Sequence, residues 1–147
     1  MLKALALAVL LLAPTAAFAG TVAEVDQAIT DNLGDPAAFH DAFAAIQAAV
    51  NDNDPAALAA WVAFPIDVRM GDKAVTLADA DAFIAAYPNL FTPPIKSAIT
   101  GQKYEDLFVN YQGAMFGAGQ LWVSGICKTD ACESVDWRII TIQEASK

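Results

Sequence analysis

Apolar residues recur at helical spacing over the first half of the chain. One helix face is formed by residues at i, i+4, i+7 and i+11: Phe39, Phe43, Ile46 and Val50. A shorter stripe, which Gly34 can end, consists of Val25, Ile29 and Leu33. Asp35–Pro36 and Asp54–Pro55 each combine an N-cap aspartate with a first-turn proline. We therefore expect a second helix after Asp35, and a third that carries Leu58, Trp61 and Val62.

The pattern changes to strand period after residue 63. Residues 64–70 alternate apolar and non-apolar side chains, and Gly71–Asp72 is a turn into a second strand over 73–77. The apolar set should lie under the helices: Phe64, Ile66, Val68 and Met70. Asp67 and Arg69 are therefore expected to point the other way.

Two further helices are expected before residue 104. The first has Asp79 in its first turn, carries Phe83, Ile84 and Tyr87 on one side, and should stop at Pro88. The second has Thr92 as its cap, Pro93 at its first position and Gly101 at its end.

The remainder predicts three long strands, roughly 104–116, 120–128 and 134–144, with turns at 117–119 and between Cys127 and Cys132. If these cysteines face each other, antiparallel counting places Trp122 opposite Trp137. Helices followed by strands, without a linker or a repeat, indicate one α+β domain over residues 20–147.

Residues 1–19 do not belong to that domain. A short basic start at Lys3 is followed by an apolar run over 4–13, and then by Ala17-Phe18-Ala19, an A-x-A cleavage site. The run is shorter than the roughly 20 apolar residues that span a bilayer. We expect a cleaved bacterial signal peptide, a periplasmic or secreted protein, and no membrane anchor in the mature form.

The two cysteines, Cys127 and Cys132, fit that compartment, because oxidising conditions favour a disulfide. Their spacing is not the C-x-x-C of redox-active pairs. Two cysteines and one histidine, His40, make metal binding improbable. We expect a local clip on a turn, and neither a metal nor a cofactor.

Composition limits the partners. Hydrophobic residues make up 56% of the chain, which excludes intrinsic disorder. Acidic residues number 17 against 8 basic ones, for a net charge of −9. Nucleic-acid binding rests on Lys and Arg that neutralise phosphates, so this balance argues against it.

Two strings carry a resemblance to a known family. They are Phe64-Pro65-Ile66-Asp67-Val68 and the stretch from Asn110 to Trp122, NYQGAMFGAGQLW. Together with the element order, they resemble exported bacterial members of the nuclear transport factor 2-like superfamily, which includes ketosteroid isomerases and SnoaL-like proteins. The resemblance implies a cystatin-like α+β cone, in which helices cover a curved antiparallel sheet and leave a cavity. Functions in that superfamily range from catalysis to pure binding, so fold alone does not choose.

An isomerase-type site would need a carboxylate base in an apolar cavity. Asp67 is the candidate acid or base, although its predicted direction favours a solvated or ion-paired role. His40 lies off the apolar helix stripe and is expected to be exposed. No nucleophilic set and no phosphate-binding loop is evident. We name no catalytic residue.

Polar residues within the apolar strands are the candidates for a ligand pocket. Alternation places Phe108, Asn110, Gln112, Ala114 and Phe116 on one face. If that face is the inner one, a small-ligand pocket would be lined by Tyr87, Asn110, Gln112 and Trp122. The competing interpretation is that these amides only satisfy backbone groups or a buried water. Because both strand faces are largely apolar, a homodimer is also expected.

The sequence therefore favours an exported, non-enzymatic binding domain for a small apolar or amphipathic molecule or a protein partner. One alternative is an isomerase or dehydratase that uses a cavity aspartate. Another is a periplasmic inhibitor or immunity-type protein, whose acidic surface would steer it to a basic partner.

Overall fold

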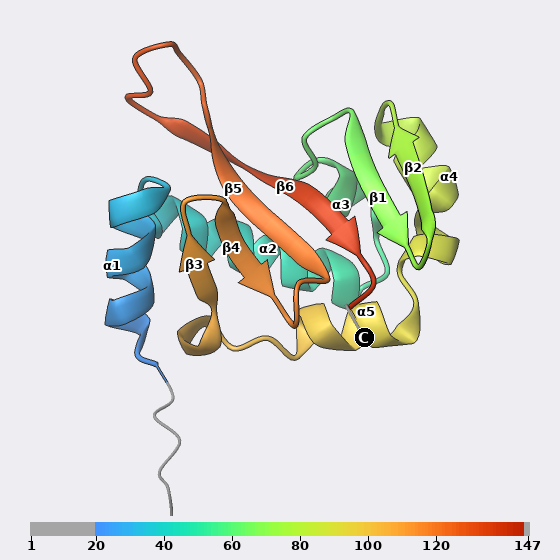
Figure 1. The fold of residues 1–147 in the computed structure, drawn as a ribbon, viewed down its shortest axis with the longest axis horizontal. Coiled ribbons are helices and arrows are strands. Elements are labelled where there is room, and N and C mark those ends of the chain that lie inside the picture. Colours follow the sequence, from blue (N-terminus) through green and yellow to red (C-terminus); the bar gives the residue numbers. More distant parts are fainter. Residues whose placement is uncertain (1–19, 146–147) are drawn as a thin grey trace, which may run out of the picture.

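The computed structural model describes residues 20–145, so the predicted signal segment lies outside the described residues. Within this range helices come first and most strands last (Figure 1). The elements are α1 (Val22–Asn32), α2 (Pro36–Asn51), α3 (Pro55–Ala59), β1 (Ile66–Met70), β2 (Lys73–Leu77), α4 (Ala80–Leu90), α5 (Pro93–Thr100), the 3-10 turn η1 (Tyr104–Asp106), β3 (Phe108–Asn110), β4 (Gly113–Phe116), β5 (Leu121–Cys127) and β6 (Val135–Gln143).

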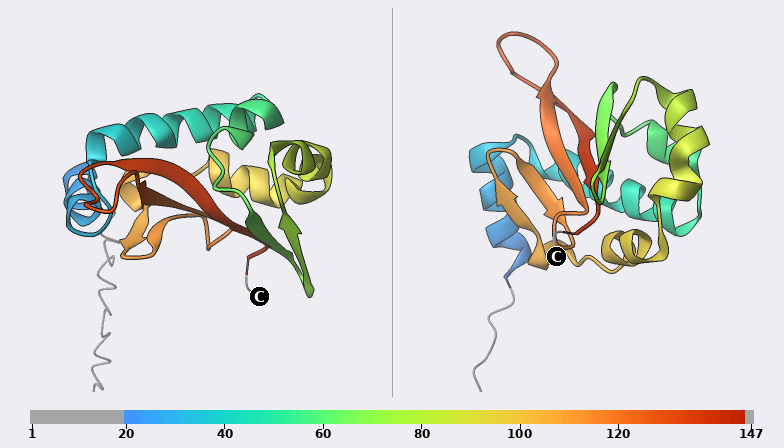
Figure 2. Two further views of the ribbon diagram at one scale, coloured as in Figure 1. Left: turned by 90° about the horizontal axis from the view of Figure 1, so that it is seen from above. Right: turned by 45° about the vertical axis from the view of Figure 1, so that its right-hand side comes forward.

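The strands form one six-stranded sheet in the order β2-β1-β6-β5-β4-β3. β1 and β6 are parallel, and the other neighbours are antiparallel. Helices α2, α4 and α5 lie on one side of the sheet, and the other side carries no helix of the described chain (Figure 2, left). The expected α+β class is confirmed, as helices packed on an open sheet. The expected antiparallel sheet is wrong in one place, because the parallel pairing of β1 with β6 makes the sheet mixed. None of the helices described is long and apolar enough to cross a membrane.

Aspartate caps begin three helices. Asp35 and Asp54 are the predicted N-caps, whereas Asp79, which was expected inside the first turn, is the N-cap of α4. The side chains of Asp35, Asp54 and Asp79 accept hydrogen bonds from backbone N–H groups two or three residues further on, at 2.9 Å. These bonds satisfy donors that the first helical turn leaves free.

Two predicted helix ends are wrong. Helix α4 continues through Pro88 to Leu90. Pro88 lacks one backbone donor, but Tyr87 and Leu90 on either side of it are packed in the core and hold the last turn. Helix α3 ends at Ala59, so Trp61 lies beyond it and its carbonyl accepts a hydrogen bond from Ile139 N–H. The chain there already pairs with β6.

The core lies between the helices and the sheet. Its largest fully buried side chains include Phe39, Phe83, Phe91 and Phe116. Phe39 contacts Trp137 with ring centroids 4.8 Å apart, which joins α2 to β6. Since aromatic side chains bury large apolar areas, this layer supplies much of the free energy that holds the helices on the sheet.

The predicted strand 104–116 is wrong as one element. It divides into η1, β3 and β4, and a two-residue turn at Tyr111–Gln112 separates the two strands. The turn reverses the chain, so the alternation does not run through it. Phe108 is 52% exposed, whereas Ala114 is fully buried, and the two lie on opposite faces. The Phe108 face is therefore not the inner face, which was the condition for the predicted small-ligand pocket.

The disulfide between Cys127 and Cys132 is present, but the predicted pairing of Trp122 with Trp137 is wrong. Cys127 pairs with Val135, so the disulfide closes within the hairpin loop and does not mark the last strand pair. Trp137 lies opposite Gly125, and Trp122 lies opposite Thr141. The observed register differs from the predicted one by three residues at Trp137 and, beyond the bulge in β6, by four at Trp122.

Candidate functional site

The open face of the sheet contains a pocket where β1 and β6 separate. The chain pairs with β6 through Val62 and Ile139, and again through Val68 and Ile142. Five residues lie between these pairings on the first segment and two on β6, so the first segment must bulge away. Pro65, within the detour, has no N–H with which to pair. The gap in the ladder makes room for the pocket.

A β-bulge in β6 directs two consecutive side chains toward this gap. Val123 pairs with Ile139 and Trp122 with Thr141, which leaves Ile140 as an extra residue. Ile139 and Ile142 are both fully buried on the helix side. Ile140 and Thr141, between them, therefore both face the open side, and both line the pocket.

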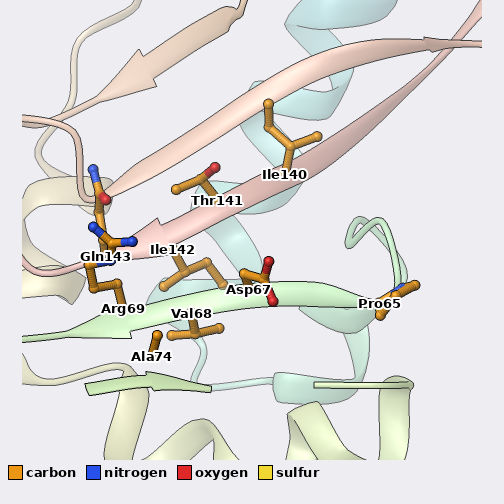
Figure 3. A pocket seen from close by; sticks show the side chains of 9 residues that line it. All are labelled: Pro65, Asp67, Val68, Arg69, Ala74, Ile140, Thr141, Ile142 and Gln143. Carbon is orange, nitrogen blue, oxygen red and sulfur yellow. The ribbon is translucent and has the colours of Figure 1, made fainter. Parts of the chain in front are cut away.

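The pocket has a volume of about 540 Å³. Figure 3 shows its lining as two neighbouring strands with an additional residue from β2. The lining consists of Pro65, Asp67, Val68, Arg69, Ala74, Ile140, Thr141, Ile142 and Gln143. The lining combines apolar side chains with charged and polar ones, and such polar groups fix the orientation of a ligand in small-molecule sites.

Two of the polar side chains are held by hydrogen bonds. Thr76 Oγ1 donates to Asp67 Oδ1 at 2.5 Å, across the β1–β2 hairpin. Gln143 Nε2 donates to the carbonyl oxygen of Gly119 at 3.0 Å. Arg69 forms no ion pair with any carboxylate of the described residues. The pocket thus contains a carboxylate and a guanidinium that do not neutralise each other.

Gln112 and Trp122 are brought together beside this pocket. They line a smaller hollow of about 160 Å³ with Ile140 and Thr141, which also line the larger pocket. Next to it, the rings of Phe108 and Trp122 meet edge to face with centroids 6.4 Å apart. The homodimer expected from the sequence stays a prediction.

Tyr87 and Asn110 lie elsewhere. Tyr87 is buried among the helices, where it stacks on Phe91 at 4.5 Å, and its hydroxyl has no hydrogen-bond partner within residues 20–145. Asn110 Oδ1 accepts a hydrogen bond from Gln112 N–H at 2.8 Å, which closes the β3–β4 turn. The four sequence-predicted pocket residues thus do not line one cavity.

Asp67 is exposed between the buried Ile66 and Val68, so the predicted direction of its side chain is confirmed. It faces away from the helices. An acid or base inside a cavity under the helices was the basis of the isomerase alternative, and the position of Asp67 does not provide one. The described residues also contain no group of three or more side chains suited to hold a metal ion.

Sequence reasoning did not select Arg69, Thr141 or Gln143 as site residues. The buried positions of β6, at Trp137, Ile139 and Ile142, depart from a period of two. Such a break signals a bulge. The bulge cannot be recognised from the sequence, because four of the six residues 137–142 are apolar, Ile140 among them. The apolar pattern there fits a strand with or without a bulge.

A second cluster of titratable groups joins α1, α2 and η1. Asp26 Oδ1 accepts a hydrogen bond from the Tyr104 hydroxyl at 2.7 Å and lies 2.9 Å from His40 Nε2. The His40 ring stacks on Tyr104 with centroids 4.0 Å apart. Burial raises the pKa of the Tyr104 phenol above its usual range, and the hydrogen bond and negative charge of Asp26 raise this pKa further.

The raised pKa of Tyr104 predicts a loss of stability in alkali. An unfolded tyrosine has a pKa of about 10, so the contribution of Tyr104 is fully present below that pH and decreases above it. At pH 7, we expect Tyr104→Phe to lower the free energy of unfolding by about 1.5 kcal/mol, because the lost bond goes to a charged group. Urea unfolding should show this difference shrinking above pH 10.

Tyr111→Phe is the matched control, because Tyr111 is 78% exposed in the β3–β4 turn. It should leave the free energy of unfolding unchanged at every pH. A Tyr104→Phe deficit that stays constant from pH 7 to pH 11 would contradict the link between Tyr104 ionisation and stability.

The fold and the pocket together define an α+β domain with one helix-covered sheet face and one open face that carries a polar-lined pocket. Comparison with known proteins gives no match to a family model, a curated protein or a solved structure. Function must therefore be argued from the site itself.

Proposed function

We propose that the protein is an exported, non-enzymatic binding domain that takes up a small molecule in the pocket on the open face of its sheet. The observation that carries the proposal is the 540 Å³ pocket, with Asp67 and Arg69 both present and not paired with each other. A small amphipathic ligand could use the apolar wall and the polar groups together.

The bulge supports a built site. A regular β6 would direct Ile140 or Thr141, but not both, to the open face. The hydrogen bond from Gln143 to Gly119 and the one from Thr76 to Asp67 hold two polar groups in place before any ligand arrives. Pre-oriented groups lose less conformational entropy on binding, which favours affinity.

Export is supported by the apolar run and A-x-A sequence at the start of the chain, and the Cys127–Cys132 disulfide is compatible with an oxidising compartment. We further propose that the fold belongs to the nuclear transport factor 2-like group of cystatin-like cones. Its support is the element order and a curved sheet with helices on one side.

The proposal is tested with pools of small water-soluble metabolites, followed through the backbone amide shifts of the purified protein. We expect at least one compound to shift the amides of β1 and β6 around Asp67, Arg69 and Thr141. Ala74→Phe should abolish these shifts, because Ala74 lines the pocket and a phenyl ring would occupy it.

Val75→Phe is the matched control. Val75 follows Ala74 on β2, is 53% exposed and does not line the pocket, so this variant should retain the shifts. Shifts that persist in Ala74→Phe, or that no compound produces at β1 and β6, would overturn the proposed function.

A further inference from the structure

Charges of opposite sign lie side by side in the pocket. Asp67 and Arg69 are two residues apart on β1, so their Cα atoms are separated by about 7 Å and their side chains lie on one face. Figure 3 shows the Arg69 side chain beside Gln143 at one end of the pocket, and the Asp67 carboxylate nearer its middle. Each charge is available to a ligand.

The remaining hydrogen-bonding capacity differs along the pocket. Arg69 offers up to five N–H donors, in a planar fork that suits a carboxylate. Asp67 accepts only one side-chain hydrogen bond, from Thr76, so its second oxygen can accept another from an ammonium group. One end therefore suits a carboxylate and the middle suits an amine.

The other end of the pocket is apolar. Pro65 and Ile140 lie there, past Asp67 as seen from Arg69 (Figure 3). Neither side chain offers a hydrogen bond, so this end suits an aliphatic group, whose transfer from water is favourable at about 0.8 kcal/mol per buried CH₂.

A ligand with a single charge fits less well. An anion would be attracted by Arg69 but repelled by Asp67. A cation would be attracted by Asp67 but repelled by Arg69. The whole chain, at a net charge of −9, also repels anions at long range. A neutral molecule with separated charges avoids both costs.

From this arrangement we infer that the open-face pocket binds a small zwitterion with an aliphatic group, of the free amino acid class. The carboxylate of the ligand contacts Arg69, its ammonium contacts Asp67, and its aliphatic side chain packs on Pro65 and Ile140. This inference rests on the proposed binding function and names its ligand class.

The test uses three probes that share the same branched aliphatic chain and differ in their charged groups: leucine, 3-methylbutylamine, which lacks the carboxylate, and 4-methylpentanoate, which lacks the ammonium. Each is titrated into the purified protein while the amide shifts of β1 and β6 are followed. We expect leucine to bind up to about fivefold more tightly than either analogue, because contacts between exposed charges contribute no more than about that factor.

Two uncharged variants assign each ligand charge to its residue. Arg69→Gln should lower the affinity for leucine to that of 3-methylbutylamine. It should not lower the affinity for 3-methylbutylamine itself. Asp67→Asn should weaken leucine to the level of 4-methylpentanoate, and its amide oxygen can still accept from Thr76, which preserves the hairpin.

Lys103→Gln and Asp41→Asn are the controls. Both residues are exposed and outside the pocket lining, and the substitutions change the net charge by the same amounts. Neither should alter leucine binding. If the controls weaken leucine as much as the pocket variants do, the effect belongs to net charge and the inference is overturned.

The possible outcomes distinguish a wrong ligand class from a wrong binding function. If either singly charged analogue binds the pocket as tightly as leucine, or metabolites bind there while leucine does not, the ligand class is wrong and the binding function stands. If neither leucine nor any metabolite shifts β1 and β6, both fail.

Discussion

Replacing Phe39 with alanine is expected to lower the free energy of unfolding by about 3–5 kcal/mol, as measured by urea denaturation. Phe39 is fully buried in α2 and contacts Phe43, Tyr104 and Trp137. Its removal leaves a cavity where the first long helix meets both η1 and β6. Because domains of this size have only about 5–15 kcal/mol of stability, the loss should be large in relation to the whole.

Phe108→Ala is the matched control, because it removes the same atoms from the opposite face of the sheet. Phe108 is 52% exposed and meets only the edge of Trp122 among aromatic rings of the described chain. Its loss should cost about 0.5–1 kcal/mol. If the two substitutions cost the same, the assignment of one covered and one open sheet face is wrong. Phe39→Leu, with a smaller cost, keeps the comparison measurable if Phe39→Ala does not fold.

Replacing Gly113 with alanine is expected to lower the free energy of unfolding by about 2–3 kcal/mol, which chemical denaturation again measures. A Cβ atom at Gly113 would lie 2.6 Å from the carbonyl oxygen of Val123, a backbone atom that cannot move aside without disturbing β5. Gly113 also has a φ of 154°, which L side chains rarely adopt. The pairing of β4 with β5 depends on this close approach.

Gly71→Ala separates the cost of the backbone conformation from the cost of the close contact. Gly71 has a φ of 59°, but a Cβ atom there would meet only the flexible Glu144 side chain, at 3.6 Å. It should cost about 1–2 kcal/mol, from backbone conformation alone. An equal or smaller cost at Gly113 would show that the contact with Val123 yields easily.

Local rules predicted the helices well, because their signals lie within a few residues. The aspartates at 35, 54 and 79 cap their helices independently of the tertiary structure, since each accepts a hydrogen bond from the first turn of its own helix. The β1–β2 hairpin was predicted for the same reason, from Gly71 and the alternation around it. Pro88 shows the limit, because tertiary packing holds α4 for two residues past it.

Pairing between distant strands could not be predicted in this way. The two cysteines suggested a register in which Trp122 meets Trp137, but the disulfide lies inside the loop, and the strands pair three residues away at Trp137 and four at Trp122. Covalent proximity of two sulfurs constrains a loop and leaves the strand register free. The register follows instead from which faces of β5 and β6 the helices cover.

The candidate site shows the same division. Asp67 was correctly expected to face away from the helices, yet its partners in the pocket come from β6, some 75 residues later in the sequence. Gln112 and Trp122 do lie together, though on the open face and without Tyr87. The pocket arises from a gap in the pairing of β1 with β6 and from a bulge in β6. Neither feature produces a recognisable pattern in the local sequence.

The sequence by itself determined the α+β class, the starts of α2, α3 and α5, the outward direction of Asp67 and the acidic surface, because each depends on local periodicity, capping or composition. Only the tertiary structure decided which sheet face is open, where Phe108 points, and that β1 and β6 separate to form a pocket. Those features depend on contacts between segments far apart in the chain, whose relative placement is set by how all the apolar faces are buried at once.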